Sequence, residues 1–360
     1  MAQATGELVS ADPVVDTPPG MQAWRVRYWT RSDSNRPIEV TGMIVAPREA
    51  APRDARKIVA WAHGTSGVAQ DCAVSTSPDF WQVTPGLSEM IAAGYVVVAP
   101  DYPGLGSDMQ HGYLIGREAA HSVIDAVRAA QQIPGAYAGK DFAVWGESQG
   151  GHAALWTASE ARRYGKGLNL VGTAAVAPPT DLLENLRTAK DQNVRAMLTA
   201  FVTYSWSQRF GAPLADLFGS VNRGVVGRLA RNNCIKLDAS PKLGTIVGIL
   251  SVRNELKKAD LAAHPAWASI ARRNSTSAAS VRGPVYMAQS VDDPLVSSDV
   301  TAAFARQLCR RGRAVQYESL PGGDHAKSGA NSAGSALAWI ANRFAGKPVP
   351  STCRQLLATR

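Results

Sequence analysis

The feature that most constrains this chain is the pentapeptide Gly-Glu-Ser-Gln-Gly at residues 146–150. Residues 141–145 before it form a short apolar run that suits a buried strand, and residues 151–163 after it carry apolar side chains at helical spacing. A serine between two glycines at a strand-to-helix turn is typical of a nucleophile elbow. We interpret Ser148 as a nucleophile raised above a sheet edge, with a helix N-terminus behind it that favours negative charge.

Apolar strands alternate with amphipathic helices on both sides of this motif, which predicts an α/β fold with a doubly wound, mostly parallel sheet. We expect strands at residues 57–62, 95–100, 168–176, 284–289 and 315–320, and helices at residues 87–93, 117–133, 300–308 and 332–344. Residues 23–29 and 38–45 alternate apolar and polar side chains around a turn, which predicts an antiparallel hairpin at a sheet edge.

The pattern divides the chain into three parts. Residues 1–22 carry little apolar pattern and are expected to form an arm. Residues 23–179 and 283–360 form the sheet domain, and residues 180–282 show helical patterns without a convincing strand. We interpret this helical stretch as a cap inserted into the sheet domain.

A serine nucleophile requires a base, which is most often a histidine. Only two of the six histidines follow Ser148 at any distance along the chain. His325 lies in a glycine-rich loop directly after the last predicted strand, whereas His264 lies inside the predicted cap. We therefore predict that His325 is the base.

The base in turn requires a carboxylate that orients its ring. Asp292 and Asp293 both follow the strand predicted at residues 284–289. The spacing Ser-x-x-Asp-x-x-Val at residues 290–296 favours Asp293, and the other aspartate would then cap or brace the turn.

An oxyanion hole needs two backbone N–H groups aimed at the developing charge. Gln149 supplies one by its position after the nucleophile, and we predict that Thr65, in the loop after the early strand, supplies the other. His63 is interpreted as a structural residue of that loop. Asp101 is expected to fix its own loop. Glu147 either forms a hydrogen bond below the elbow or is solvated.

Charge and apolar content exclude several classes of protein. The net charge is +9, but the basic residues are scattered and form no stripe with interleaved aromatic residues, so we expect no nucleic-acid binding. No apolar run approaches the ~18 residues of a membrane span. The chemistry inferred for Ser148 requires no metal or organic cofactor. The oligomeric state is left open, with a monomer favoured.

The four cysteines, Cys72, Cys234, Cys309 and Cys353, form no C-x-x-C pair, so neither zinc nor thioredoxin-type chemistry is expected. An even, sparse set fits two disulfides in an exported protein, and the alternative is four buried thiols. The sequence Ala-Gln-Ala at residues 2–4 resembles the end of a cleaved signal peptide. We therefore expect a secreted protein whose leader has been removed.

From about residue 55 onward the chain resembles the α/β-hydrolase fold, and within it the secretory lipases of the lipase A type. The resemblance rests on His-Gly-Thr at residues 63–65, the run at residues 99–106, the elbow, the helical insertion and the four cysteines. The oxyanion loop is similar to that of the bacterial members. The resemblance implies an extracellular hydrolase of acylglycerols or other esters, and disulfides Cys72–Cys234 and Cys309–Cys353.

We consequently predict a carboxylic-ester hydrolase that forms an acyl-enzyme and takes a small-molecule or lipid ester, with a lipid–water interface as a further partner. Two alternatives remain: a serine peptidase of the same fold, and a hydrolase fold kept as a binding protein without activity.

Overall fold

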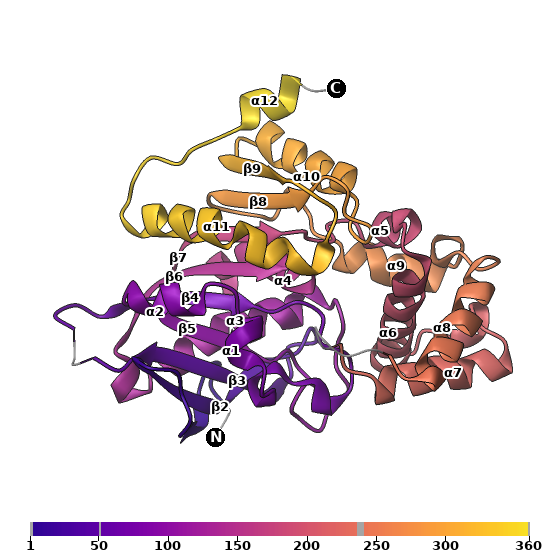
Figure 1. Ribbon diagram of the computed structural model, residues 1–360, viewed down its shortest axis with the longest axis horizontal. Coiled ribbons are helices and arrows are strands. Elements are labelled where there is room, and N and C mark those ends of the chain that lie inside the picture. Colours follow the sequence, from indigo (N-terminus) through magenta and orange to yellow (C-terminus); the bar gives the residue numbers. More distant parts are fainter. Residues whose placement is uncertain (1–2, 50–51, 236–240, 359–360) are drawn as a thin grey trace.

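A nine-stranded sheet runs through the molecule in the order β1-β2-β3-β5-β4-β6-β7-β8-β9 (Figure 1). The computed structural model describes residues 3–49, 52–235 and 241–358. The strands are β1 Leu8–Pro13, β2 Met21–Arg31, β3 Pro37–Pro47, β4 Arg56–Ala62, β5 Val96–Pro100, β6 Ala138–Glu147, β7 Asn169–Val176, β8 Val285–Ser290 and β9 Val315–Leu320. The pairs β1–β2, β2–β3 and β3–β5 are antiparallel, and the remaining pairs are parallel. The predicted α/β fold class is confirmed.

Helices cover both faces of the sheet. One face carries α3 Gly116–Ala130, α4 Gln149–Tyr164 and α10 Ser298–Arg310, and the other carries α1 Phe80–Val83, α2 Leu87–Ala92 and α11 Ser328–Phe344. All five residues of β5 are buried because helices pack on both sides of it. On the face of α2 and α11, the rings of Trp61 and Trp145 meet edge to face with centroids 4.8 Å apart.

The first residues differ from the prediction. The arm expected at residues 1–22 contains β1, which pairs antiparallel with β2 and forms the edge of the sheet. The predicted hairpin of β2 and β3 is present, but it lies one strand inside that edge. Strand β1 is stabilised by backbone hydrogen bonds to β2, and its side chains stay partly or fully exposed. Its sequence therefore lacks the apolar pattern from which a strand is predicted.

Between β7 and β8 the described residues form helices and no strand. These are α5 Leu182–Thr188, α6 Gln192–Phe210, α7 Ser220–Asn232, α8 Leu243–Leu256 and α9 Pro265–Asn274, which we call the helical insertion. Its helices lie together at one end of the molecule (Figure 1) and share an apolar core that also takes in Val68, Tyr113 and Leu114 of the sheet domain. A largely buried ion pair between Arg209 of α6 and Glu118 of α3 also joins the two parts.

Two disulfides tie distant segments together, with the pairing that the resemblance implied. Cys309 of α10 is bonded to Cys353, the first residue of α12 Cys353–Ala358, and this bond fixes the C-terminal helix to the sheet domain. Cys72 is bonded to Cys234, which lies two residues past the end of α7. None of the described helices is long and apolar enough to cross a membrane.

Candidate active site

Ser148 stands at the junction of β6 and α4 with backbone angles φ 54° and ψ −117°. Such a positive φ is strained for a residue with a side chain and is characteristic of the nucleophile elbow. The glycines on either side permit the turn. A Cβ at Gly146 would lie 2.2 Å from the carbonyl oxygen of Gly150, and a Cβ at Gly150 would lie 1.8 Å from that of Ala62. A side chain at either glycine would therefore collide with the neighbouring strand or helix.

The structure brings Ser148, His325 and Asp293 together in one chain of hydrogen bonds. The hydroxyl of Ser148 lies 2.9 Å from Nε2 of His325, and Nδ1 of His325 lies 2.7 Å from Oδ2 of Asp293. The three residues follow the carboxyl ends of β6, β9 and β8, which are parallel and therefore end at the same edge of the sheet. In the tautomer that this arrangement requires, Nδ1–H donates to Asp293 and Nε2 accepts from Ser148.

The position of Asp293 is fixed by its own turn. Its Oδ1 accepts from the backbone N–H groups of Leu295 and Val296 at 2.8 and 3.0 Å, and its Oδ2 also accepts from the amide of Gln289 at 3.0 Å. Asp292 is exposed and has no side-chain hydrogen bond to any described residue. The bracing role expected for the second aspartate is therefore wrong, because Asp293 itself both meets His325 and braces the turn.

The electrostatics of the pair favour an ionised Asp293 and a basic His325. Burial by itself would lower the pKa of His325, but the hydrogen bond and the charge of Asp293 outweigh it and raise that pKa above 6.5. Burial would raise the pKa of Asp293, but the hydrogen bond and charge of His325, with the two backbone N–H groups, hold it below 3.8. His325 is therefore suited to accept a proton from Ser148.

Glu147 lies beneath this group, and its carboxylate is packed against the N-terminus of α11. A Cβ on Gly329 would lie 2.3 Å from Glu147 Oε2, and the backbone N–H of Gly329 donates to this carboxylate. Its Oε1 is sealed from solvent and has no hydrogen-bond partner among the described residues. Burial raises the pKa of Glu147 to about 7, in spite of the opposing effect of Gly329 and of the charge on His325. Of the two readings made from sequence, the hydrogen-bonded one is correct.

Gln149 lines the site at the first position of α4, where its backbone N–H has no partner within the helix. Its side-chain amide donates to Nε2 of His111 at 3.2 Å, while Nδ1–H of His111 donates to the carbonyl oxygen of Pro103 at 2.8 Å. Burial lowers the pKa of His111 to about 3, so this histidine is neutral and accepts at Nε2. No sequence pattern indicated a role for His111, because this residue lies in an irregular loop.

Thr65 follows β4 in a loop that runs beside the elbow, where a Cβ on Gly64 would lie 3.7 Å from the carbonyl oxygen of Glu147. The hydroxyl of Thr65 lies 2.8 Å from that of Tyr113, which lines the site, whereas Thr65 itself does not line the cavity. The role of its N–H in an oxyanion hole stays a prediction.

Two further loop residues have the structural positions expected from the sequence. Nδ1–H of His63 donates to the carbonyl oxygen of Gly64 at 2.6 Å, and burial lowers the pKa of this histidine. Asp101 accepts from the backbone N–H and the hydroxyl of Ser75 and from the hydroxyl of Thr41, so it fixes the loop after β5.

A mostly apolar cavity of about 50 Å³ opens at Ser148 and His325. Its apolar walls come from the sheet domain and from α5 and α6 of the helical insertion: Leu114, Pro179, Leu182, Leu186, Ala189, Leu198, Val202, Trp206, Leu295 and Val296. Trp206 is fully buried and its indole N–H donates to the carbonyl oxygen of Tyr113 at 2.9 Å. Phe210, the last residue of α6, does not line this cavity.

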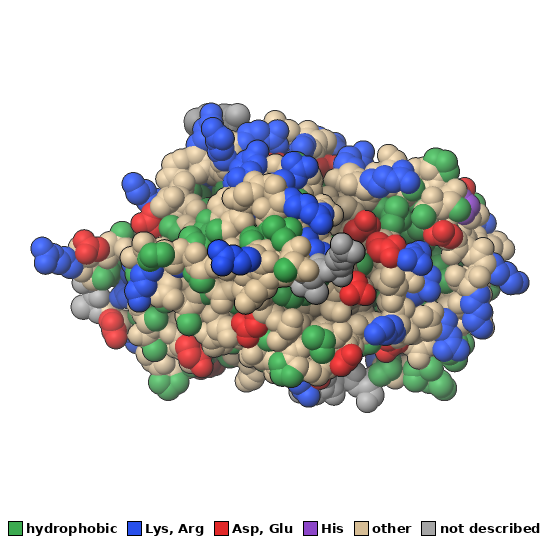
Figure 2. All heavy atoms as spheres, turned by 90° about the horizontal axis from the view of Figure 1, so that it is seen from above, with side chains coloured by type: hydrophobic (Ala, Val, Ile, Leu, Met, Phe, Trp, Pro, Cys, Tyr) green, Lys and Arg blue, Asp and Glu red, His purple; other side chains and the backbone are tan. Residues whose placement is uncertain are grey.

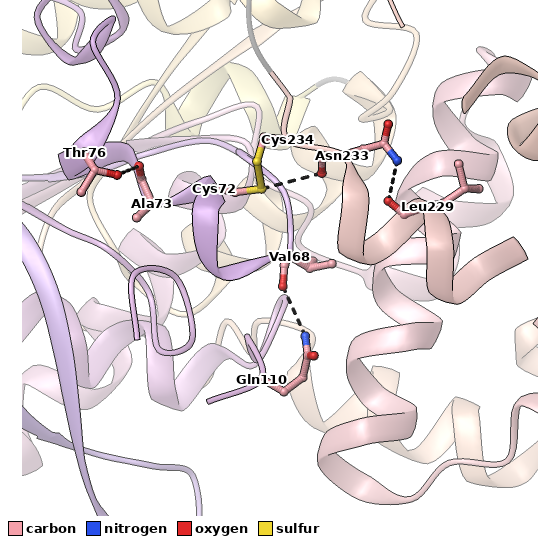
Figure 3. The surroundings of a disulfide bond; sticks show 8 residues. All are labelled: Val68, Cys72, Ala73, Thr76, Gln110, Leu229, Asn233 and Cys234. Atoms are coloured by element: carbon pink, nitrogen blue, oxygen red, sulfur yellow. Dashed lines mark hydrogen bonds between the residues drawn. A yellow bond between two sulfur atoms is a disulfide. The ribbon is translucent and has the colours of Figure 1, made fainter. Parts of the chain in front are cut away.

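The disulfide between Cys72 and Cys234 lies close to the loop that follows β4 and contains Thr65 (Figure 3). Gly67 and Cys234 form an antiparallel bridge, so the end of α7 is joined to the segment that follows Thr65. Among the described residues no group of three or more His, Cys, Asp or Glu side chains could hold a metal ion.

The chain matches the family model of secretory lipases over residues 70–211 and 249–352. It is 22% identical to a probable inactive lipase of Mycobacterium tuberculosis, over 92% of this chain and 76% of that protein. It is 21% identical to lipase A of Moesziomyces aphidis, over 84% of this chain and 68% of that one.

Solved structures show the same fold. Lipase A of Candida antarctica in its closed state superposes with a TM-score of 0.78 at 18% identity, covering 99% of this chain and 90% of that one. The rice cell wall degrading esterase LipA of Xanthomonas oryzae superposes with a TM-score of 0.72 at 18% identity, covering 95% and 98%. These matches do not separate a bacterial from a fungal branch. With the α/β-hydrolase fold and more than half of its length matched by the family model, the chain belongs to the secretory lipase family.

Proposed function

We propose that this protein is a secreted serine hydrolase of carboxylic esters, with lipid esters as its substrate class. The observation that carries the proposal is the hydrogen-bonded chain Ser148–His325–Asp293 at the mouth of an apolar cavity. A hydroxyl at 2.9 Å from an imidazole whose other nitrogen meets a buried carboxylate is the arrangement that activates a serine for acyl transfer.

In the first half of the reaction, Nε2 of His325 takes the proton from Ser148 as Oγ forms a bond to the ester carbonyl carbon. The carbonyl oxygen becomes an oxyanion, which the N–H groups of Gln149 and Thr65 bind. Each such donor contributes roughly 3 kcal/mol to lowering the barrier. Protonated His325, stabilised by Asp293, then gives the proton to the leaving alkoxide, and an acyl-Ser148 ester and a free alcohol result.

In the second half, water takes the place of the alcohol. His325 takes one proton from the water as its oxygen bonds to the acyl carbon, and the same oxyanion donors act again. Collapse of this intermediate breaks the bond to Ser148 Oγ, which receives the proton back from His325. A carboxylic acid is released and the free serine is restored, with no other reactant consumed.

The walls of the cavity support an apolar acyl group as the part of the substrate that lies near Ser148. We further propose that residues 180–282 act as a cap over the domain formed by residues 23–179 and 283–360, because Leu198, Val202 and Trp206 of α6 form one wall of the cavity. The relatives named as lipases and as an esterase support the ester class. Two disulfides and membership of a secretory family support secretion.

The experiment is hydrolysis of p-nitrophenyl esters from acetate to palmitate, with Ser148→Ala beside the exposed control Ser280→Ala. We expect Ser280→Ala to retain activity and Ser148→Ala to lose roughly 10⁶-fold in kcat. If the rate of hydrolysis is highest with acetate or butyrate, the protein is a short-chain esterase. If the rate is highest with longer acyl chains, it is a lipase whose cavity widens to admit the acyl chain.

Two further assays distinguish the alternative functions. A serine peptidase would cleave peptide aminomethylcoumarin substrates faster than esters. A binding protein without activity, as the name of the mycobacterial relative describes that protein, would fail to react with a fluorophosphonate at Ser148. Either result, or activity that survives Ser148→Ala, would overturn the proposal.

A further inference from the structure

Helix α8 is apolar on two opposite sides. On its inner side Gly248, Val252 and Leu256 are buried, and α8 packs against α6 and α7. On its outer side a stripe of large apolar residues faces solvent: Leu243 is 77% exposed, Ile246 41%, Val247 59% and Leu250 38%. Their spacing of three, four and seven residues places them on one face of the helix. We call these four residues the outer stripe.

The contacts of α8 with α7 lie away from the outer stripe, which stays exposed among the described residues. The two helices run antiparallel: Thr245 Oγ1 donates to Asn233 Oδ1 at 2.6 Å at one end, and Ser251 Oγ donates to Asn222 Oδ1 at 2.5 Å at the other. Between these points a Cβ on Gly248 would lie 3.1 Å from Leu229. The side of α8 that faces α7 is therefore occupied by hydrogen bonds and apolar contacts with α7, and the outer stripe faces away from α7.

Positive charge is concentrated in the same part of the chain. Residues 180–282 hold 15 Lys and Arg against 7 Asp and Glu, a net charge of +8 out of +9 for the whole chain. On α7, α8 and the residues next to them, six exposed cations form no ion pair with a described carboxylate: Arg223, Arg228, Arg231, Lys242, Lys257 and Lys258. The right-hand end of the molecule in Figure 2, where α7 and α8 lie in Figure 1, displays Lys and Arg beside hydrophobic side chains.

We propose that the outer stripe of α8 docks on an anionic lipid surface, with the surrounding cations against the lipid headgroups. An apolar helix face flanked by Lys and Arg is the pattern of helices that lie in the plane of a lipid interface. A second copy of the chain fits less well, because two surfaces of like charge would repel each other. A flat lipid surface also accepts a single helical stripe without the shape complementarity that a protein partner requires.

The inference extends the proposed function, since it names the surface on which a lipid ester would be met. Helix α6 packs against α8 and carries Leu198, Val202 and Trp206 of the cavity wall. Docking through α8 therefore places one wall of the cavity next to the helix that contacts the lipid.

Binding is measured without turnover, on Ser148→Ala protein, by co-sedimentation with phosphatidylcholine vesicles with and without phosphatidylglycerol. The test variant is Leu243→Asp/Val247→Asp, and its matched control is Val15→Asp, at a residue 88% exposed outside the helical insertion. A second pair is Arg228→Glu/Lys257→Glu against Arg310→Glu/Arg311→Glu on α10 and the residue after it.

We expect binding to the phosphatidylglycerol vesicles, weakened roughly tenfold or more by each test variant and unchanged by each control. Equal binding by the test and control variants, no preference for the anionic vesicles, or loss of a dimer in light scattering with the Leu243→Asp/Val247→Asp variant would overturn the proposal. Hydrolysis of soluble p-nitrophenyl acetate by the same variants with Ser148 intact checks that they fold. A protein that binds vesicles but hydrolyses no ester would contradict the proposed function and leave the docking inference standing.

Discussion

The backbone N–H of Ile235 donates to the carbonyl oxygen of Ser66 at 2.7 Å, which joins the end of α7 to the residue next to Thr65. The bridge between Gly67 and Cys234 continues this pairing, and the disulfide to Cys72 locks it (Figure 3). The segment that follows α7 and the loop proposed to bind the oxyanion are therefore held rigidly against each other.

The two disulfides are predicted to differ in their effect on activity. Cys72→Ser/Cys234→Ser should lower kcat on p-nitrophenyl esters, because the loop of Thr65 is released. Cys309→Ser/Cys353→Ser, which frees only α12, should leave kcat within about twofold of wild type. The chain-entropy model allows at most about 5 kcal/mol for the loop closed by the first bond and about 4 kcal/mol for the second, over sequence separations of 162 and 44. Equal losses of kcat in the two variants at a temperature where both are folded would argue against the coupling.

Asp293 and Asp292 provide a matched pair of neighbouring carboxylates. Asp293→Asn should reduce kcat by about 10⁴-fold, because an amide can no longer hold the tautomer of His325 that accepts from Ser148. Asp292→Asn should have little effect, because this side chain is exposed and has no partner in the described part of the chain. Steady-state kinetics on p-nitrophenyl butyrate compare the two, and similar losses would refute the assignment of Asp293.

The pH dependence of kcat/KM should respond to Glu147. His325 must be neutral to accept a proton, so activity falls as the pH drops through its raised pKa, and part of that rise comes from the charge of Glu147. Glu147→Gln should therefore move the acid limb of the profile to lower pH. Glu89→Gln, at an exposed position of α2, should leave the limb in place. An acid limb that moves to higher pH in Glu147→Gln would contradict this reading.

The same carboxyl should affect stability with a definite sign. The pKa of Glu147 in the folded protein is about 7, above its ordinary value of 4.5, so its favourable contribution is complete below pH 4.5 and is lost as the pH rises through 7. Glu147→Gln should then melt higher than wild type above pH 7, by at most about 3 kcal/mol in free energy of unfolding. Below pH 4.5 the two proteins should melt alike. Calorimetry at both pH values tests the difference between them.

The elbow glycine should tolerate no side chain. Gly150→Ala would place a Cβ 1.8 Å from the carbonyl oxygen of Ala62, which is backbone and cannot move aside, so we expect loss of soluble expression or of all activity. Gly334→Ala, on an exposed part of α11 with no atom within 4 Å of the new Cβ, should stabilise the protein by up to about 1 kcal/mol. Thermal unfolding of both variants is the measurement, and an active, stable Gly150→Ala would show that the elbow can be built differently.

Local features of the sequence predicted the elbow and most of the sheet correctly. Ser148 could be located because the strand, the turn and the helix around it are contiguous, so spacing alone reports the geometry. Strands β4 and β5 and the buried residues of β6 to β8 could be located because parallel strands covered on both faces consist largely of apolar residues. Strand β1 was missed because an exposed edge strand is held by backbone hydrogen bonds, which leave no mark on side-chain pattern.

The residues that are chemically able to act can be identified from the chain alone: a serine at an elbow, and histidines and aspartates after later strands. Which of them meet depends on how distant segments pack together. Asp293 rather than Asp292 faces His325 because β8 and β9 are neighbours and the turn after β8 directs one carboxylate inward. Glu147 is enclosed because α11 packs over it, and α8 keeps an apolar outer stripe because none of the described helices covers it. Burial and contact are properties of the packed chain, and no single stretch of sequence contains them.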